Sequence, residues 1–162
     1  MLIIVSACLL GLNTKYDGST NAHALIQKYS SAGKFIPVCS EQLGGLPTPR
    51  SPMEIVEGTG QDVLAGRCLV QGKQGEVVTP QFILGAKEVL KIVEMVKVTA
   101  AILKERSPSC GVNHIYDGSF SHRLMSGQGV TAAILKEHNI PVYSEVELSE
   151  ERLQELLSDD EE

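Results

Sequence analysis

Three short apolar runs of this chain each lead into a turn that contains a cysteine, and this repeated arrangement most constrains the fold. Each run has the length and the aliphatic composition of a buried β-strand. In chain order, the runs and their cysteines are 2–5 with Cys8, 35–38 with Cys39, and 98–103 with Cys110. In an open parallel sheet, the loops at the carboxyl ends of the strands converge on one crevice, where ligands bind. If the runs are neighbours in such a sheet, the three thiols meet there and form a metal or cluster site.

Helical segments separate the runs, as they do in parallel α/β proteins. We expect a fourth strand over 140–143, and helices over about 20–32, 79–96, 129–138 and from 149 onward. Thr20 or Asn21 is the expected N-cap of the first helix, and Gly33 fits its C-terminal end. The second helix has Thr79 as its expected N-cap, Pro80 at its first position and apolar residues at a period of about 3.6.

The expected fold is a single α/β domain of three layers, α/β/α, with a mainly parallel sheet. It occupies residues 1–148, and residues 149–162 form a C-terminal helix, capped by Ser149, and an acidic tail. Residues 55–78 contain five glycines and short β-branched pieces, which predict a small β excursion after the second strand. Two further irregular features are expected, a glycine- and proline-rich loop over 44–52 and a hairpin around 116–120.

One heptamer, Thr-Ala-Ala-Ile-Leu-Lys-Glu, occurs twice, at 99–105 and at 131–137. The first copy follows a long helix and ends at a proline-containing loop, so we interpret it as a strand. The second copy precedes the final strand, so we interpret it as a helix. Context often overrides the intrinsic propensity of such segments.

Composition excludes several classes of partner. The 14 basic and 20 acidic residues give a net charge of −6, whereas binding to nucleic acid polymers needs clustered Lys and Arg.

No apolar run approaches the roughly 20 residues of a membrane span. Val5 to Cys8 superficially fits a lipoprotein cleavage site, but no basic segment precedes it and the apolar run is too short. We therefore expect a cytoplasmic protein without a signal peptide or a membrane partner. The sequence makes no prediction of its oligomeric state.

The remaining candidate residues are less specific. Cys68 lies in a strand-like segment and is expected to be a small buried hydrophobe. Arg50 follows two prolines and either holds an anion or ties down its loop. The four histidines show no metal-ligand spacing. Of these, His114 and His122, near the hairpin, are the ones for which a functional role is hardest to dismiss. From spacing alone, the three strand-end cysteines indicate a shared site, a nucleophilic thiol or a redox pair.

The segments around these cysteines resemble a bacterial family long labelled as of unknown function, some of whose members are thiouracil desulfidases. The resemblance extends over about residues 1–145. Three motifs carry it in order, namely residues 6–11 with 16–18, residues 37–39 with 41–50, and residues 107–111. Two positions depart from the family pattern, because many relatives have proline in place of Ser40 and cysteine in place of Thr14.

The resemblance implies a [4Fe-4S] cluster held by Cys8, Cys39 and Cys110, with one iron left without a protein ligand. It implies desulfuration of a small thiobase or thionucleoside, such as 4-thiouracil, by hydrolysis and without electron transfer, releasing sulfide. In that chemistry Glu41 activates the attacking water, and Ser107 donates a hydrogen bond to the ring or relays a proton. Without the resemblance, Glu41 fits a solvated loop acid and Ser107 a loop cap. Two alternative functions remain, a thiol or iron–sulfur redox protein and a metal-binding sensor without turnover.

Overall fold

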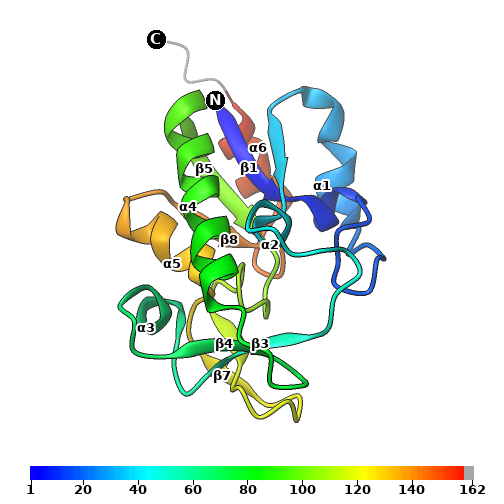
Figure 1. Ribbon diagram of the computed structural model, residues 1–162. Coiled ribbons are helices and arrows are strands. Elements are labelled where there is room, and N and C mark those ends of the chain that lie inside the picture. Colours follow the sequence, from blue (N-terminus) through cyan, green and yellow to red (C-terminus); the bar gives the residue numbers. More distant parts are fainter. Residues whose placement is uncertain (159–162) are drawn as a thin grey trace.

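The centre of the protein is a four-stranded parallel sheet in the computed structural model, which describes residues 1–158 (Figure 1). The order across the sheet is β2-β1-β5-β8. The strands are β1 (Leu2–Ser6), β2 (Phe35–Val38), β5 (Val98–Leu103) and β8 (Val142–Ser144). The chain leaves β1 toward one edge of the sheet and later passes from β5 toward the other edge. The strand order therefore reverses between β1 and β5, the position where open α/β sheets bind ligands.

Helices cover both faces of the sheet, as predicted for a three-layer α/β/α domain. On one face, Ile4, Ala101 and Leu103 belong to the same buried cluster as residues of α4 (Thr79–Val96) and α5 (Val130–Glu137). On the other face, the alternate strand residues pack with α1 (Ala24–Lys28) and α6 (Glu150–Leu157), and they are Ile3, Val5, Ala100 and Ile102. Strands that are buried on both faces explain the continuous apolar runs of the sequence.

Smaller elements lie around the carboxyl ends of the sheet. The predicted β excursion is an antiparallel hairpin of β3 (Met53–Val56) and β4 (Leu69–Gly72), which also contains the short helix α3 (Gly60–Leu64). The second predicted hairpin consists of β6 (His114–Tyr116) and β7 (Leu124–Ser126). In Figure 1 both hairpins lie below the sheet, beyond the carboxyl ends of its strands. Three short helical turns complete the structure, η1 (Ala7–Leu10), η2 (Ser30–Ala32) and α2 (Ser40–Leu43).

The first helix is shorter than predicted, because tertiary hydrogen bonds hold the segment before it. The backbone N–H of Asn21 donates to Cys8 O at 3.0 Å, and that of His23 donates to Leu9 O at 2.9 Å. These bonds fasten the segment to η1, so α1 begins only after His23 and not after Thr20 or Asn21. The α-helix also ends earlier than predicted, at Lys28. Gly33 instead follows the separate turn η2, where it adopts a left-handed conformation with φ of 71°.

Two other boundaries differ from the prediction. Thr79 is the first residue of α4, and the N-cap is Val78. The Thr79 hydroxyl does not cap the helix, because it accepts a hydrogen bond from the Val70 N–H at 2.9 Å. The last strand begins at Val142 and not at residue 140. The Ile140 N–H still donates to Leu135 O at the end of α5, and Pro141 has no N–H to donate.

The C-terminal helix begins where the sequence predicts. The Ser149 hydroxyl accepts a hydrogen bond from the Arg152 N–H at 3.1 Å, and Leu153 and Leu157 are buried against the sheet. The division of the chain at residue 148 stays a prediction, and the acidic tail over 159–162 lies outside the described residues. Within residues 1–158, no helix has the length and apolarity needed to cross a membrane.

Candidate functional site

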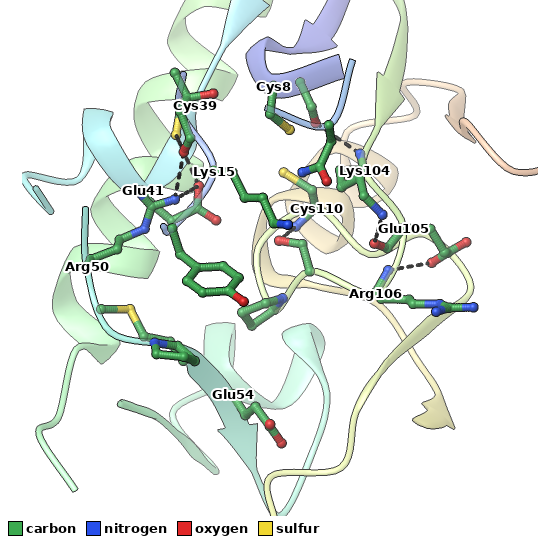
Figure 2. Close-up of a pocket in the computed structure, with 18 of the residues that line it drawn as sticks. Cys8, Lys15, Cys39, Glu41, Arg50, Glu54, Lys104, Glu105, Arg106 and Cys110 are labelled. Atoms are coloured by element: carbon green, nitrogen blue, oxygen red, sulfur yellow. Dashed lines mark hydrogen bonds and ion pairs between the residues drawn. The ribbon is translucent and has the colours of Figure 1, made fainter. Parts of the chain in front are cut away.

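A cavity of about 380 Å³ opens at the carboxyl ends of the sheet, and all three strand-end cysteines line it (Figure 2). Cys8 lies on η1 after β1, Cys39 precedes α2 after β2, and Cys110 lies in the loop after β5. Figure 2 shows their sulfur atoms turned toward the same space. This convergence follows from the strand order, because β1 lies between β2 and β5. The ligand roles of the thiols stay a prediction.

Close contact between two helices positions the turn that carries Cys39. A Cβ atom added at Gly85 of α4 would lie 1.9 Å from Ser40 O, and one added at Gly44 would lie 2.0 Å from Gln81 O. Only glycine permits this approach of the two backbones. Gly85 and Gly44 therefore let α2 rest directly on α4 and bring the Cys39 turn to the cavity.

Glu105 organises the loop that carries Cys110. Its buried carboxylate accepts hydrogen bonds at 2.9–3.3 Å from the backbone N–H groups of four loop residues, which are Arg106, Val112, Asn113 and His114. Burial raises the pKa of this carboxyl, but the four N–H donors outweigh burial and hold the pKa below its usual value. The sequence gives no local signal for this role, because it depends on the tertiary course of the loop.

We expect Glu105→Gln to destabilise the protein at neutral pH by about 1–3 kcal/mol, the usual worth of hydrogen bonds to a charged group. Because the folded pKa is lowered, this stability is present above the unfolded pKa and is lost as pH falls through the folded pKa. Urea unfolding of both proteins at several pH values measures the difference in free energy. Glu137→Gln, an exposed acid on α5, is the control. A difference that does not change with pH would contradict this account of Glu105.

The three thiols lie in surroundings that disfavour their ionisation. Burial, followed by the charge of Glu41, raises the pKa of Cys39 to about 12. The pKa of Cys110 is also raised, first by burial and then by Glu41. Burial likewise raises the pKa of Cys8. A positively charged group is therefore needed to hold these sulfurs as thiolates, as metal binding does.

Glu41 and Arg50 form a nearly buried pair beside Cys39. Glu41 Oε2 lies 3.8 Å from Arg50 Nη2 and accepts a hydrogen bond from the Cys39 thiol at 3.3 Å. The guanidinium also donates to Thr14 O at 3.1 Å and to Thr48 Oγ1 at 3.0 Å. Arg50 therefore ties down two loops, which is one of the two roles expected of it, and it also pairs with the Glu41 carboxylate.

Ser107 has the capping contacts of a loop serine and also faces the cavity. Its Oγ accepts hydrogen bonds from the N–H groups of Ser109 and Cys110, both at 3.1 Å. These bonds use the lone pairs of the hydroxyl, so its proton stays available to a molecule in the cavity.

A buried triangle of hydroxyl groups joins the Cys39 and Cys110 loops. Thr131 Oγ1 of α5 lies 2.9 Å from Ser40 Oγ and 3.1 Å from Ser109 Oγ, and the two serine hydroxyls also contact each other. All three side chains are at most 2% exposed. Ser40, one of the departures from the family pattern, therefore helps hold the two cysteine loops together.

Within the described residues, the candidate ligands are not arranged around a single metal ion. A lone zinc ion holds each thiolate at about 2.3 Å, which requires the sulfurs to be nearly in contact. Within residues 1–158, no three Cys, His, Asp or Glu side chains are close enough to bind one metal ion. All four cysteines lie in this part of the chain, and each is a free thiol.

Comparison with known proteins agrees with the geometry. A model of the 2-thiouracil desulfurase family matches residues 3–147. The chain belongs to this family. Protein YbbK of Bacillus subtilis (strain 168), which is uncharacterised, is 44% identical over 149 residues, covering 92% of this chain and 99% of that protein. A solved structure of the [4Fe-4S]-dependent thiouracil desulfidase TudS is similar with a TM-score of 0.83, at 38% identity, over 97% of this chain and 99% of that one.

Membership of the 2-thiouracil desulfurase family confirms the resemblance expected from the three cysteine motifs.

The other candidate residues differ in whether they line the cavity. Cys68 does not line the cavity, and its thiol donates to Thr59 O at 3.7 Å. His114 is exposed outside the cavity, whereas His122 lines it and packs edge-on against Tyr116, with ring centroids 6.2 Å apart.

Sequence reasoning missed several polar side chains that line the cavity. They are Lys15, Tyr16, Asn21, Glu54, Lys104, Arg106 and Tyr116. Glu54 is buried, and its carboxylate accepts the N–H groups of Gly118 and Phe120 at 3.0 and 3.2 Å, which fixes the tip of the β6–β7 hairpin. Two of these residues had a signal in the sequence. Tyr16 lies in the motif over 16–18, and Lys104 directly follows a predicted strand at the same edge as the cysteines.

Proposed function

We propose that the protein is a hydrolytic desulfidase that uses a [4Fe-4S] cluster to remove sulfur from a thiolated nucleobase or nucleoside such as 4-thiouracil. The net reaction is C=S + H₂O → C=O + H₂S, so no electrons are gained or lost. The observation that supports it best is the cavity in which Cys8, Cys39 and Cys110 face a fixed carboxylate, Glu41. The family assignment and the similarity to TudS support the removal of sulfur from a thiouracil by an iron–sulfur enzyme.

Cys8, Cys39 and Cys110 are the residues that would hold the cluster. Their number suits a cluster with one iron open to a ligand, in contrast to the four cysteines usual for electron transfer. Their spread over three loops fits a group larger than one ion. When bound, the cluster supplies a thiophilic Lewis acid for the sulfur of the thiocarbonyl, which makes sulfide a better leaving group.

Glu41 is the candidate general base. Its carboxylate lies at the cavity wall, two residues after Cys39, and Arg50 holds it in place. A carboxylate in this position can take a proton from the water that attacks the carbon bearing sulfur. Ser107, whose hydroxyl proton is free, can donate a hydrogen bond to the ring or return a proton to it.

The alternatives fit the same cavity less well. A redox protein would use Cys39 and Cys110 as a pair and would leave the convergence of Cys8 unexplained. A sensor that binds one zinc or iron ion needs closer ligands than the described residues provide.

The test is anaerobic reconstitution, counts of iron and labile sulfide, and an assay with 4-thiouracil. We expect the loaded protein to release sulfide and form uracil without any added reductant. Protein without iron and a chain with Cys68→Ala are the negative and positive controls. Sulfide that appears only with an electron donor would replace hydrolysis by the redox alternative, and zinc without labile sulfide would favour the sensor.

A further inference from the structure

A second pair of opposite charges lies at the cavity, and the chemistry described above does not use it. The ammonium group of Lys104 is 2.9 Å from Glu145 Oε1 and donates to the Glu105 carbonyl oxygen at 3.0 Å. Glu145 is 8% exposed and also accepts the Glu105 N–H at 2.7 Å. Lys104 lines the cavity and Glu145 does not, so the positively charged member of the pair is the one at the cavity.

The position of Lys104 is fixed from both sides. It directly follows β5, and its backbone N–H donates to Ser6 Oγ at 3.0 Å, which joins it to the end of β1. An ammonium group has three donors, and the two contacts to Glu145 and Glu105 use two of them. One N–H therefore remains for a negatively charged group in the cavity.

Three other cationic side chains line the cavity, namely Lys15, Arg50 and Arg106. Arg50 binds Glu41 and the oxygens of three loop residues, and in Figure 2 it lies on the opposite side of the cavity from Lys104. Lys15 lies 3.9 Å from Asp17 and over the ring of Tyr16. Arg106 is exposed. Lys104 differs from all three because it directly follows β5 and is joined to the end of β1, the strand that leads to Cys8.

The buried thiols of Cys8 and Cys110 line the same cavity as Lys104. Buried thiolates need such a positive charge, because a low-dielectric site does not solvate anions.

We propose that Lys104 is the charge-balancing residue of the desulfuration site: its ammonium group, held by Glu145, stabilises the negative charge of the thiolate-bound cluster and of the sulfur that leaves the ring. The proposal rests on the cluster of the proposed function. Glu145 is then a positioning residue that sets how strongly Lys104 acts.

Two substitutions that change the charge near the cluster in opposite directions test this proposal. In loaded protein, Lys104→Met removes the positive charge, so reduction of the cluster becomes less favourable and its reduction potential falls. Glu145→Gln removes the opposing charge, so the potential rises. A merely structural role would not shift the potential in opposite directions. Redox titration followed by electron paramagnetic resonance measures both shifts.

The repeated heptamer supplies the matched control. Lys136 occupies the same place in the second copy, but it is exposed at the end of α5. Lys136→Met should leave both the potential and the turnover unchanged. Lys104→Met should lower kcat by about 10²–10³-fold with a smaller change in KM, as expected for loss of an electrostatic contact made in the transition state. Lys104→Arg, which keeps the charge, should restore most of the potential.

The outcomes separate this proposal from the function on which it rests. Potentials that shift in the same direction in the Lys104→Met and Glu145→Gln variants, or that match Lys136→Met, overturn the role of Lys104. If Lys104→Met does not bind the cluster, the test uses the reduction potentials of Lys104→Arg and Glu145→Gln. A reduction potential of Glu145→Gln at or below that of the wild type then overturns the role of Lys104. If the two variants shift the potential in opposite directions but the loaded wild type releases no sulfide, only the desulfidase function is overturned. A wild type that binds no cluster overturns both.

Discussion

Replacing Cys8, Cys39 or Cys110 by alanine, one at a time, should abolish cluster binding and turnover, whereas Cys68→Ala should retain both. The three strand-end thiols line one cavity, and a cluster held by only two of them would lose a third of its protein ligands. Cys68 is buried as well, but it does not line the cavity. The comparison therefore separates loss of a ligand from loss of a buried thiol.

Iron and labile sulfide counts after anaerobic reconstitution measure the result. Thermal unfolding of the metal-free chains should show similar stability for Cys68→Ala, Cys8→Ala and Cys110→Ala, since each removes one small buried side chain, whereas Cys39 is only partly buried. Equal iron content in Cys8→Ala and Cys68→Ala would show that the ligand assignment is wrong.

Much of the fold could be predicted because it is encoded locally. Apolar runs that alternate with helical segments specify a parallel sheet, and the cysteines follow its strands directly. The repeated heptamer shows that the local sequence does not always determine the secondary structure. Its first copy forms β5 and its second forms α5, and only the flanking residues distinguish them. The late start of α1 has a similar cause, since hydrogen bonds from Asn21 and His23 to η1 prevent helix formation there.

The parts of the site that the sequence did not reveal depend on residues distant in the chain. Glu105 and Glu145 are 40 positions apart, yet one accepts the backbone N–H of the other. The triangle of Ser40, Ser109 and Thr131 requires α5 to lie against both cysteine loops. Nothing in the local pattern around these residues distinguishes them from surface acids or ordinary turn serines, because their roles arise only from tertiary contacts.

Glu41→Gln should retain the cluster and still bind a thiobase, but lose about 10²–10⁴-fold in turnover, the usual contribution of a general base. The substitution is nearly isosteric and removes the charge that activates water. Arg50 remains anchored by Thr14 and Thr48, so the two loops that it joins should keep their positions. Single-turnover sulfide release and a separate binding titration with 4-thiouracil distinguish the loss of chemistry from the loss of affinity.

Ser107→Ala is the comparison that separates the two proposed roles in proton transfer. Its loss of turnover should be comparable or smaller, because a water molecule can replace a hydroxyl donor. It also removes the acceptor of the Ser109 and Cys110 N–H groups, so some loss of cluster is expected there and not in Glu41→Gln. Turnover must therefore be expressed per cluster. If Glu41→Gln then turns over at the wild-type rate, the hydrolysis can stand but another group is its base. If Glu41→Gln loses the cluster instead, the carboxylate acts by supporting Cys39, and its role as a base fails.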